Sequence, residues 1–218
     1  MLELWLIRHG ETAWNAEDRI QGSIDLPLSA EGRRQAARLA PRLAGTAFDA
    51  AFASDLERAR QTGEIALPGT ELLLDRRLRE LAYGVFEGKI WSALEADEAA
   101  MARHWHEDRV GRRIPGGESY GDLVARFEAF RAELPARGRV IAFVHGGTVR
   151  AAMYAFLGPP RPGVWRFDVA NTGITRLRYR PDGVTIVTLN DHAHLDRVAG
   201  GEPARPSAAS AEAVAQPS

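Results

Sequence analysis

Twice in this sequence, an almost continuously apolar run leads to a histidine that is followed by glycine. Leu2–Ile7 leads into Arg8-His9-Gly10, and Arg139–Val144 leads into His145-Gly146. Runs of this length and composition are typical of strands buried on both faces of a parallel sheet. Because ligands of open α/β sheets bind at the carboxyl ends of the strands, both histidines are expected at one ligand-binding edge.

The remainder of the chain alternates strand-like and helix-like segments, which indicates an α/β protein. Further strands are expected at residues 50–53, 71–74, 164–168, 174–179 and 184–189, with a hairpin turn at Pro181-Asp182-Gly183. Helices are expected at residues 30–44, from a cap at Ser54 or Asp55 onward, and at residues 91–106, 118–134 and 149–157. Ser29 is the expected N-cap of the first of these helices.

A chain of 218 residues, of which 45% are hydrophobic, is long enough to bury a full core. We expect one domain over residues 1–196, with a helical insertion at about residues 90–120 that could cover a site as a lid. From residue 197 to 218 the chain is dominated by Ala, Pro, Ser, Gly and Glu. Because such a composition cannot bury a core, this tail is expected to be disordered.

The composition also excludes several classes of function. Cysteine is absent, which excludes disulfides, thiolate nucleophiles and thiolate metal ligands. A formal net charge of −1 gives no electrostatic footprint for nucleic acid or for an anionic membrane surface. No apolar run approaches the ~18 residues needed to cross a bilayer, and the N-terminus lacks the features of a signal peptide. We therefore expect a cytoplasmic protein that binds neither nucleic acid nor a membrane.

Five side chains are expected to converge on one pocket, because each follows a predicted strand or lies in the helix or loop next to one: Arg8, His9, Arg58, Glu80 and His145. Two guanidiniums suit the oxygens of a tetrahedral dianion. They also disfavour an imidazolium, which leaves a neutral ring nitrogen free as a nucleophile. A carboxyl group nearby can then act as general acid toward a leaving oxygen.

Four segments, in order along the chain, resemble the motifs of the histidine phosphatase superfamily, which is also called phosphoglycerate-mutase-like. Arg8-His9-Gly10-Glu11-Thr12 is similar to its signature R-H-G-[EQ]-[ST]. Residues 54–62 are similar to its S-[DP]-L-x-R-[AT]-x-[QE]-T segment. Leu78–Gly88 resembles the loop that carries the general acid, and Val144–Gly147 resembles the segment with the second histidine.

This resemblance, which runs from Leu4 to about Leu195, implies a fold and a chemistry. The fold is a three-layer sandwich, with a mostly parallel central sheet and helices on both faces. The activity is that of a phosphomonoester hydrolase acting on a small phosphorylated substrate, without a metal or any other cofactor, because arginines supply the positive charge.

The resemblance also implies a role for each matched residue. His9 would attack phosphorus and become phosphohistidine, while Arg8, Arg58 and His145 hold the phosphoryl oxygens. Glu80 would protonate the departing alkoxide and then accept a proton from the water that hydrolyses the intermediate.

Four further residues are expected to bind the substrate: Asn15, Gln21, Gly22 and Gly146. Asn15 matches a position that often donates to the phosphoryl group, and the loop around Gln21 and Gly22 would contribute to leaving-group selectivity together with residues 90–120. The sequence names no particular phosphomonoester. It does not define an oligomeric state, and a homodimer is one of the assemblies that the sequence allows.

Within the family, the sequence resembles the phosphatase branch more than the mutases. Mutases carry a longer insertion after the acid loop and usually Asn after the His-Gly pair, whereas this insertion is short and the residue is Gly147. Gly84–Gly88 also resembles the G-x-[WF]-E-G segment of the phosphatases, with Phe86 in place of the commoner tryptophan. A cofactor-dependent phosphoglycerate mutase is the main alternative, followed by a non-catalytic phosphate-binding module.

Other motifs have weaker functional interpretations. Gly117–Gly121 fits the G-x-S-x-G pattern of serine esterases, but the basic, broken segment before it does not predict the buried strand that a nucleophile elbow requires. The pairs His104/His106 and His192/His194 have spacings that could chelate a metal, but no further ligands lie nearby in the sequence. We expect surface or packing roles for these histidines, or a place at the pocket rim for the second pair.

Overall fold

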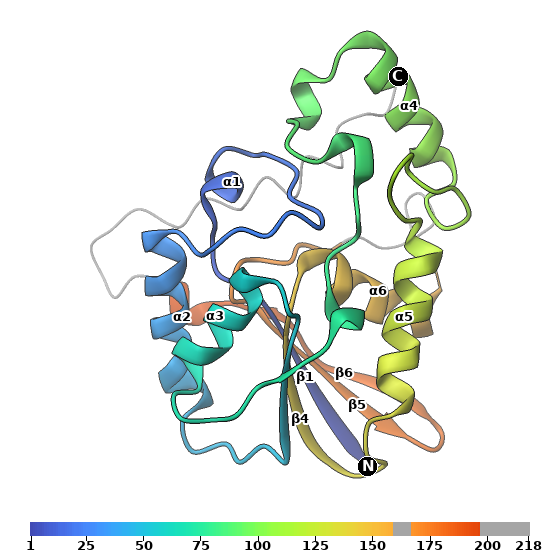
Figure 1. Cartoon of the computed structure of the whole chain (residues 1–218). Coiled ribbons are helices and arrows are strands. Elements are labelled where there is room, and N and C mark those ends of the chain that lie inside the picture. The colour runs from blue at the N-terminus through green and yellow to red at the C-terminus, as the bar shows by residue number, and fades with distance from the viewer. Residues whose placement is uncertain (159–166, 197–218) are drawn as a thin grey trace.

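The computed structural model describes residues 1–158 and 167–196, which form a six-stranded sheet with the strand order β3-β2-β4-β1-β5-β6. The apolar run at the N-terminus forms β1 near the centre of this sheet (Figure 1). The strands are β1 (Leu2–Arg8), β2 (Ala50–Ala53), β3 (Leu73–Leu74), β4 (Gly138–Val144), β5 (Ile174–Arg180) and β6 (Gly183–Asp191).

The sheet is mostly parallel, as predicted. Strands β3, β2, β4 and β1 pair in parallel, whereas β5 and β6 add an antiparallel hairpin at the β1 side. Pro181 and Asp182 form the turn of this hairpin, as expected. The strand predicted at residues 164–168 is not confirmed: residues 164–166 lie outside the described residues, and 167–168 are not in a strand. The register between β1 and β4 places Arg8 beside Val144, so the carboxyl ends of these two strands lie side by side.

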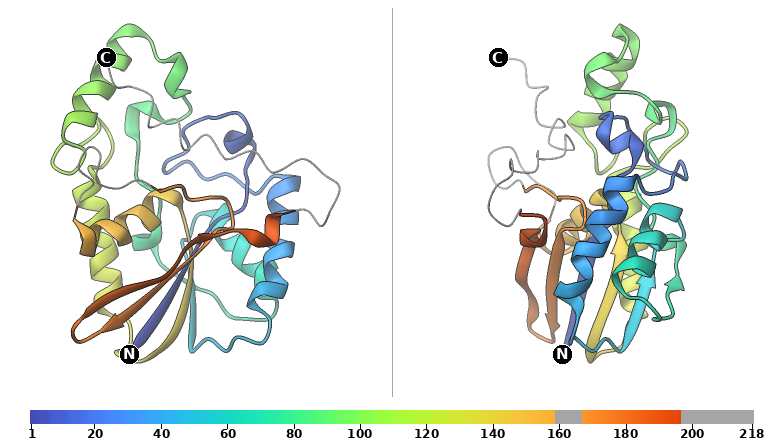
Figure 2. Two further views of the ribbon diagram at one scale, coloured as in Figure 1. Left: turned by 180° about the vertical axis from the view of Figure 1, so that it is seen from behind. Right: turned by 90° about the vertical axis from the view of Figure 1, so that its left-hand side faces the viewer.

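Helices cover both faces of the sheet, which confirms the three-layer sandwich (Figure 2). Alternate residues of a strand point to opposite faces. Leu4 and Leu6 of β1 accordingly pack in the cluster that contains residues of α5 and α6, while Trp5 and Ile7 pack in the cluster with residues of α2 and α3. The helices are α1 (Ala13–Ala16), α2 (Ala30–Leu43), α3 (Glu57–Ala66), α4 (Ala96–Glu107), α5 (Tyr120–Ala132) and α6 (Gly146–Leu157).

Helices α3 and α6 begin at positions other than those predicted, and α5 begins at Tyr120 instead of residue 118. The N-cap of α3 is Leu56, not Ser54 or Asp55, because the Ser54 backbone N–H still donates to Phe143 of β4. The first turn of α3 is capped from a distance instead, since the Glu57 N–H donates to the Asp25 carboxylate at 2.7 Å. Helix α6 begins at Gly146, three residues before the predicted start, so its N-terminus lies directly at the end of β4.

The predicted helix at residues 91–106 is divided into a 3-10 turn, Trp91–Ala93, and helix α4. Helix α4 lies beyond the carboxyl end of the sheet, away from the sandwich (Figure 1). Two backbone hydrogen bonds join the beginning and the end of this excursion: Val85 N–H donates to Pro115 at 3.1 Å and Glu118 N–H donates to Ala82 at 2.9 Å. We call residues 85–115 the lid segment.

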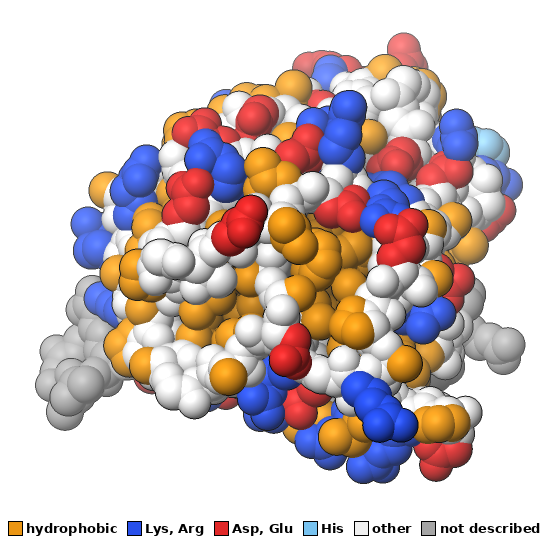
Figure 3. Space-filling view, turned by 60° about the horizontal axis from the view of Figure 1, so that its bottom comes forward, with side chains coloured by type: hydrophobic (Ala, Val, Ile, Leu, Met, Phe, Trp, Pro, Cys, Tyr) orange, Lys and Arg blue, Asp and Glu red, His pale blue; other side chains and the backbone are white. Residues whose placement is uncertain are grey.

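The face at which β1 begins has no single-sign patch of charge in the view of Figure 3, where Lys and Arg lie interspersed with Asp and Glu around hydrophobic side chains. None of the helices built from residues 1–158 and 167–196 has both the length and the apolarity needed to span a bilayer.

Candidate active site

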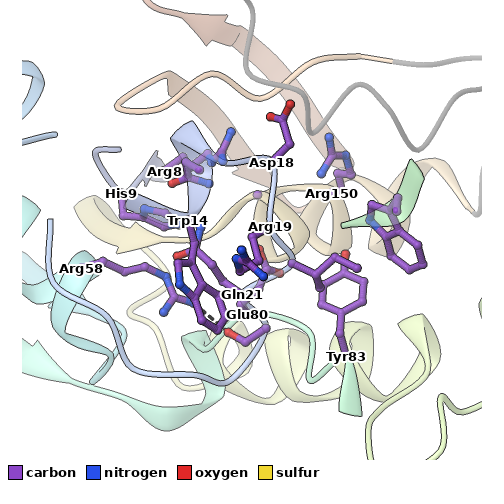
Figure 4. Close-up of a pocket in the computed structure, with 15 residues that line it drawn as sticks. Arg8, His9, Trp14, Asp18, Arg19, Gln21, Arg58, Glu80, Tyr83 and Arg150 are labelled. Atoms are coloured by element: carbon purple, nitrogen blue, oxygen red, sulfur yellow. Dashed lines mark hydrogen bonds between the residues drawn. The ribbon is translucent and has the colours of Figure 1, made fainter. Parts of the chain in front are cut away.

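A pocket opens at the carboxyl ends of β1 and β4, as expected from the two histidine motifs (Figure 4). It is open to solvent. Fifteen residues line it: Arg8, His9, Trp14, Asn15, Asp18, Arg19, Ile20, Gln21, Gly22, Arg58, Glu80, Tyr83, Trp91, Gly146 and Arg150.

The His9 ring is held in one tautomer. Its Nδ1 lies 2.7 Å from the Gly10 carbonyl oxygen, and because a carbonyl oxygen only accepts, Nδ1 carries the proton. The Nε2 atom therefore keeps its lone pair. Burial, together with the positive charges of Arg58 and Arg8, holds the pKa of His9 well below its usual 6.5. At neutral pH the ring is an uncharged base that can attack an electrophile.

Arg8 and Arg58 supply positive charge at the same point. Both side chains are buried, and burial lowers the pKa of each to about 10, which leaves both charged at neutral pH. Arg58 lies in the first turn of α3, as predicted, and its two terminal nitrogens donate to the carbonyls of Ile24 and Gly22 at 2.7 and 2.8 Å. Arg58 therefore also holds the loop after α1 beside Arg8 and His9.

His145 lies next to His9 and has no exposed surface in the ligand-free protein. The two ring centroids are 5.1 Å apart, yet His145 is fully buried and does not line the pocket. Burial and the nearby Arg58 lower its pKa well below 6.5, so the ring is neutral. Neither of its nitrogens has a hydrogen-bond partner within residues 1–158 and 167–196. Buried polar atoms are normally paired, so this ring is suited to a bound oxygen.

Glu80 is fixed by two backbone N–H groups. Its Oε1 accepts from Leu81 at 2.8 Å, and its Oε2 accepts from Gly147 at 3.0 Å, in the first turn of α6. A Cβ atom at position 147 would collide with Oε1. The absence of a side chain at Gly147 therefore allows the Glu80 carboxyl group to lie at the N-terminus of α6, and this group also lines the pocket.

The four predicted substrate-binding residues all line the pocket: Asn15, Gln21, Gly22 and Gly146. The Asn15 amide oxygen accepts from the Thr12 backbone at 3.1 Å, which leaves its NH₂ group to donate elsewhere. The buried Gln21 Oε1 accepts no hydrogen bond from any described residue. Gly22 adopts a left-handed conformation, with φ of +55°, and approaches the Glu87 carboxylate.

The position of Gly10 directly after a strand suggests a tight turn. The structure shows another reason for glycine at this position, which is close packing. It is not among the residues with positive φ. A Cβ atom there would lie 2.5 Å from the Gly32 carbonyl oxygen of α2. Gly10 and Gly32 thus let the start of α2 pack directly on the segment that carries His9.

Residues 169–173, which we call the strap, hold the backbone of Arg8 and His9 and were not predicted as part of the site. Thr172 N–H donates to the Arg8 carbonyl at 3.0 Å, and the Asn171 side chain donates to the His9 carbonyl at 3.0 Å. Thr172 has a φ of +55°, a strained conformation for a β-branched residue. Its hydroxyl lies 2.9 Å from His194 Nε2.

Sequence reasoning also missed most of the outer lining of the pocket. Arg150 could have been found, since it lies four residues after Gly146 and therefore on the same face of α6. Tyr83 follows Glu80 by three residues in the same loop. Trp91 packs against the core cluster beneath the lid segment and also lines the pocket.

The remaining histidine pairs take packing or surface positions. His106 packs against Trp91 and Trp105, while the His104 side chain is 68% exposed. His194 contacts the strap. Nowhere in residues 1–158 and 167–196 do three or more His, Asp or Glu side chains form a group that could hold a metal ion.

Ser119 is not at a nucleophile elbow. It caps α5, with its hydroxyl accepting from Asp122 N–H at 3.1 Å, and it follows a loop rather than a strand. The esterase interpretation is therefore excluded for this serine.

Known proteins share this arrangement. The sequence model of the histidine phosphatase superfamily (branch 1) matches residues 4–192. A Klebsiella pneumoniae protein named "Probable phosphoglycerate mutase GpmB" is 37% identical over 212 residues, which are 93% of this chain and 99% of that protein.

Solved structures of two phosphatases have the same fold. The α-ribazole phosphatase of Shigella flexneri superposes with a TM-score of 0.77 at 27% identity, over 87% of this chain and 96% of that one. A mutant phosphoserine phosphatase of Entamoeba histolytica, in complex with phosphoserine, superposes with a TM-score of 0.76 at 26% identity, over 89% of this chain and all of that one.

The family match includes the strand that ends in Arg8 and His9, the helix with Arg58, the Glu80 loop and the strand that ends before His145. These are the elements that the structure brings to one pocket. The chain therefore belongs to branch 1 of the histidine phosphatase superfamily.

Proposed function

We propose that this protein is a phosphomonoester hydrolase that acts through a phosphohistidine intermediate on a small phosphorylated metabolite. One observation carries the proposal: a buried, neutral His9, protonated on Nδ1, lies against two buried guanidiniums and a second neutral imidazole. Such a site combines a nitrogen nucleophile with the positive charge that a phosphoryl dianion requires.

In the first step, the lone pair of His9 Nε2 forms a bond to phosphorus and the ester P–O bond breaks. Arg8 and Arg58 stabilise the charge on the phosphoryl oxygens as it is redistributed, with His145 and Asn15 as further donors. The leaving oxygen takes a proton from Glu80. The products are free alcohol and phosphohistidine.

In the second step, water attacks phosphorus and the N–P bond breaks, which restores neutral His9. The Glu80 carboxylate accepts the proton of the attacking water, so the acid of the first step is the base of the second. Inorganic phosphate is released. Because the guanidiniums supply the electrostatic stabilisation, no metal ion enters this mechanism, and a chelator such as EDTA is expected to leave the rate unchanged.

Hydrolysis is favoured over isomerisation by the same features that distinguish the sequence from mutases. The lid segment is short, and Gly147 stands where mutases usually carry Asn. The pocket is open to solvent, which gives water access to a phosphoenzyme. Phosphoglycerate mutase is the alternative function, supported by the name of the Klebsiella relative.

Rapid quenching into alkaline SDS with a ³²P-labelled monoester tests the proposal. The wild-type chain is expected to trap an acid-labile, base-stable phosphoenzyme, and His9→Ala is expected to trap none. A phosphate-release screen over a panel of monoesters, run beside a bisphosphoglycerate-dependent mutase assay, then separates the two reactions. Isomerisation faster than phosphate release would contradict the hydrolase assignment, and the absence of a phosphoenzyme together with the absence of turnover would indicate a binding module.

A further inference from the structure

The part of the pocket beyond the phosphoryl site has a wall of apolar and aromatic side chains, made of Trp14, Ile20, Tyr83 and Trp91. We call these four residues the aromatic wall. Figure 4 shows Tyr83 on the side of the pocket away from His9 and Arg58, with Glu80 between them. Since Glu80 is the proton donor to the leaving oxygen in the proposed reaction, the leaving group extends from Glu80 toward this wall.

The aromatic wall is held rigidly before any ligand binds. The Tyr83 and Trp91 rings meet edge to face with centroids 5.9 Å apart. Trp91 also contacts Phe86 at 5.2 Å and lies parallel to the buried Trp105 at 6.3 Å. Aromatic contacts of this kind fix ring orientation, so binding against the wall requires little ordering of side chains.

The Trp14 ring is also fixed in position. The Arg19 guanidinium lies over its ring, 5.7 Å from the centroid, and Arg19 itself donates to the Gly88 carbonyl at 2.6 Å. Gly88 lies against the edge of the same indole. The face of a ring held in this way can receive a flat group from the pocket side.

In the ligand-free protein Ile20 and Tyr83 of the aromatic wall are buried, whereas Trp14 and Trp91 remain partly exposed. A flat group that packs against the partly exposed rings of Trp14 and Trp91 removes apolar area from water, which favours its binding.

From this geometry we infer that the leaving group of the substrate carries a flat apolar ring, that is, an aryl or heteroaryl group on the alcohol. The inference rests on the proposed hydrolase function. The phosphoryl site recognises the phosphate, and the aromatic wall selects the alcohol.

A matched pair of substrates tests the inference. Ethyl phosphate and 2-phenylethyl phosphate both release a primary alkoxide, so they differ chiefly in the phenyl group. We expect kcat/KM to be at least about tenfold higher for 2-phenylethyl phosphate, the effect of burying one apolar ring. It should also exceed kcat/KM for 3-phosphoglycerate.

Variants connect this preference to the wall. Trp91→Ala is expected to lower the ratio of kcat/KM for 2-phenylethyl phosphate to kcat/KM for ethyl phosphate about fivefold. Trp14→Leu is expected to lower the same ratio about threefold. Trp5→Phe, a change on the sheet face that packs with α2 and α3, serves as the matched control and should leave the ratio unchanged. Circular dichroism and melting temperature show whether each variant is folded, and Trp14→Leu provides the test if Trp91→Ala unfolds.

Each outcome is distinct. The inference is overturned if both esters release phosphate but kcat/KM for 2-phenylethyl phosphate is less than about twice that for ethyl phosphate. It is also overturned if kcat/KM is higher for 3-phosphoglycerate. Either result leaves the hydrolase function standing. A phenyl preference that survives in both folded pocket variants overturns the assignment to this wall. Release from no ester, without a phosphoenzyme, overturns the proposed function and the inference together.

Discussion

At the scale of single residues, the proposed chemistry depends on how Glu80 is held. Its carboxyl group is fixed by two backbone N–H groups, and it lies where it can reach a leaving oxygen. Glu80→Gln keeps the shape of the side chain but removes its acidic proton. We expect kcat for alkyl phosphates to fall by about 10²-fold or more, and kcat for p-nitrophenyl phosphate to fall much less. Equal losses for both ester classes would remove Glu80 from the role of acid.

Gly147→Ala tests the same role without changing the acid. The new Cβ would meet the tip of Glu80, a flexible side chain, so the fold should survive while the carboxyl group moves. We expect the loss of kcat for alkyl phosphates to follow that of Glu80→Gln, with a melting temperature within about 2 °C of the wild type. Unchanged turnover of alkyl phosphates in Gly147→Ala would mean that the Glu80 position is not constrained by residue 147.

The residue scale is also where prediction from sequence was incomplete. His9, Glu80 and the two arginines were found because their residue types and the adjoining strands indicate chemistry. Thr172 was not found, because its role is a backbone hydrogen bond to a residue 164 positions earlier and nothing in its type predicts a left-handed conformation. Backbone contacts between distant segments leave little trace in side-chain patterns.

At the scale of helices and strands, the N-cap of α2 connects stability to the site. Ser29 Oγ accepts from Gly32 N–H at 3.0 Å and donates to Glu11 Oε1 at 2.9 Å, so one hydroxyl joins α2 to the first motif. Ser29→Ala is expected to reduce the free energy of unfolding by about 1 kcal/mol. For a chain of this size, the melting temperature should fall by about 2–4 °C.

Differential scanning calorimetry measures this effect, with the exposed Ser92, changed to Ala, as the control. If both serine variants melt alike, the cap contributes no stability. The predicted start of α2 was correct because Ser29 is a local signal, whereas the start of α3 was wrong because its cap comes from Asp25, 32 positions away.

At the scale of the whole molecule, three histidines make stability depend on pH. Burial holds the pKa values of His9 and His145 well below 6.5, and burial lowers the pKa of His194 to about 4. The unfolded chain binds protons at these sites near pH 6.5, while the folded chain does not. Stability is therefore fully present above pH 6.5 and is lost as pH falls below it.

Thermal unfolding of the ligand-free protein at pH 7.5, 6.5 and 5.5 checks this dependence. We expect the melting temperature to fall over the lower part of the range and His9→Ala to reduce the slope. His104→Gln, at an exposed position, is the control and should keep the wild-type slope. A melting temperature that stays constant down to pH 5.5 would contradict the neutral, buried state of these rings.

The lid segment lies apart from the residues proposed to act on phosphorus. Residues 85–115 leave and rejoin the sandwich at Ala82–Gly84 and Pro115–Glu118, where two backbone hydrogen bonds hold the ends side by side. The segment contributes Trp91 to the pocket, but none of the groups that act on phosphorus. Because Ile20 N–H also donates to Lys89 and Tyr120 N–H donates to Arg109, a lid taken from a relative would have to keep these contacts, while a change at position 91 alters the pocket lining without touching the reaction centre.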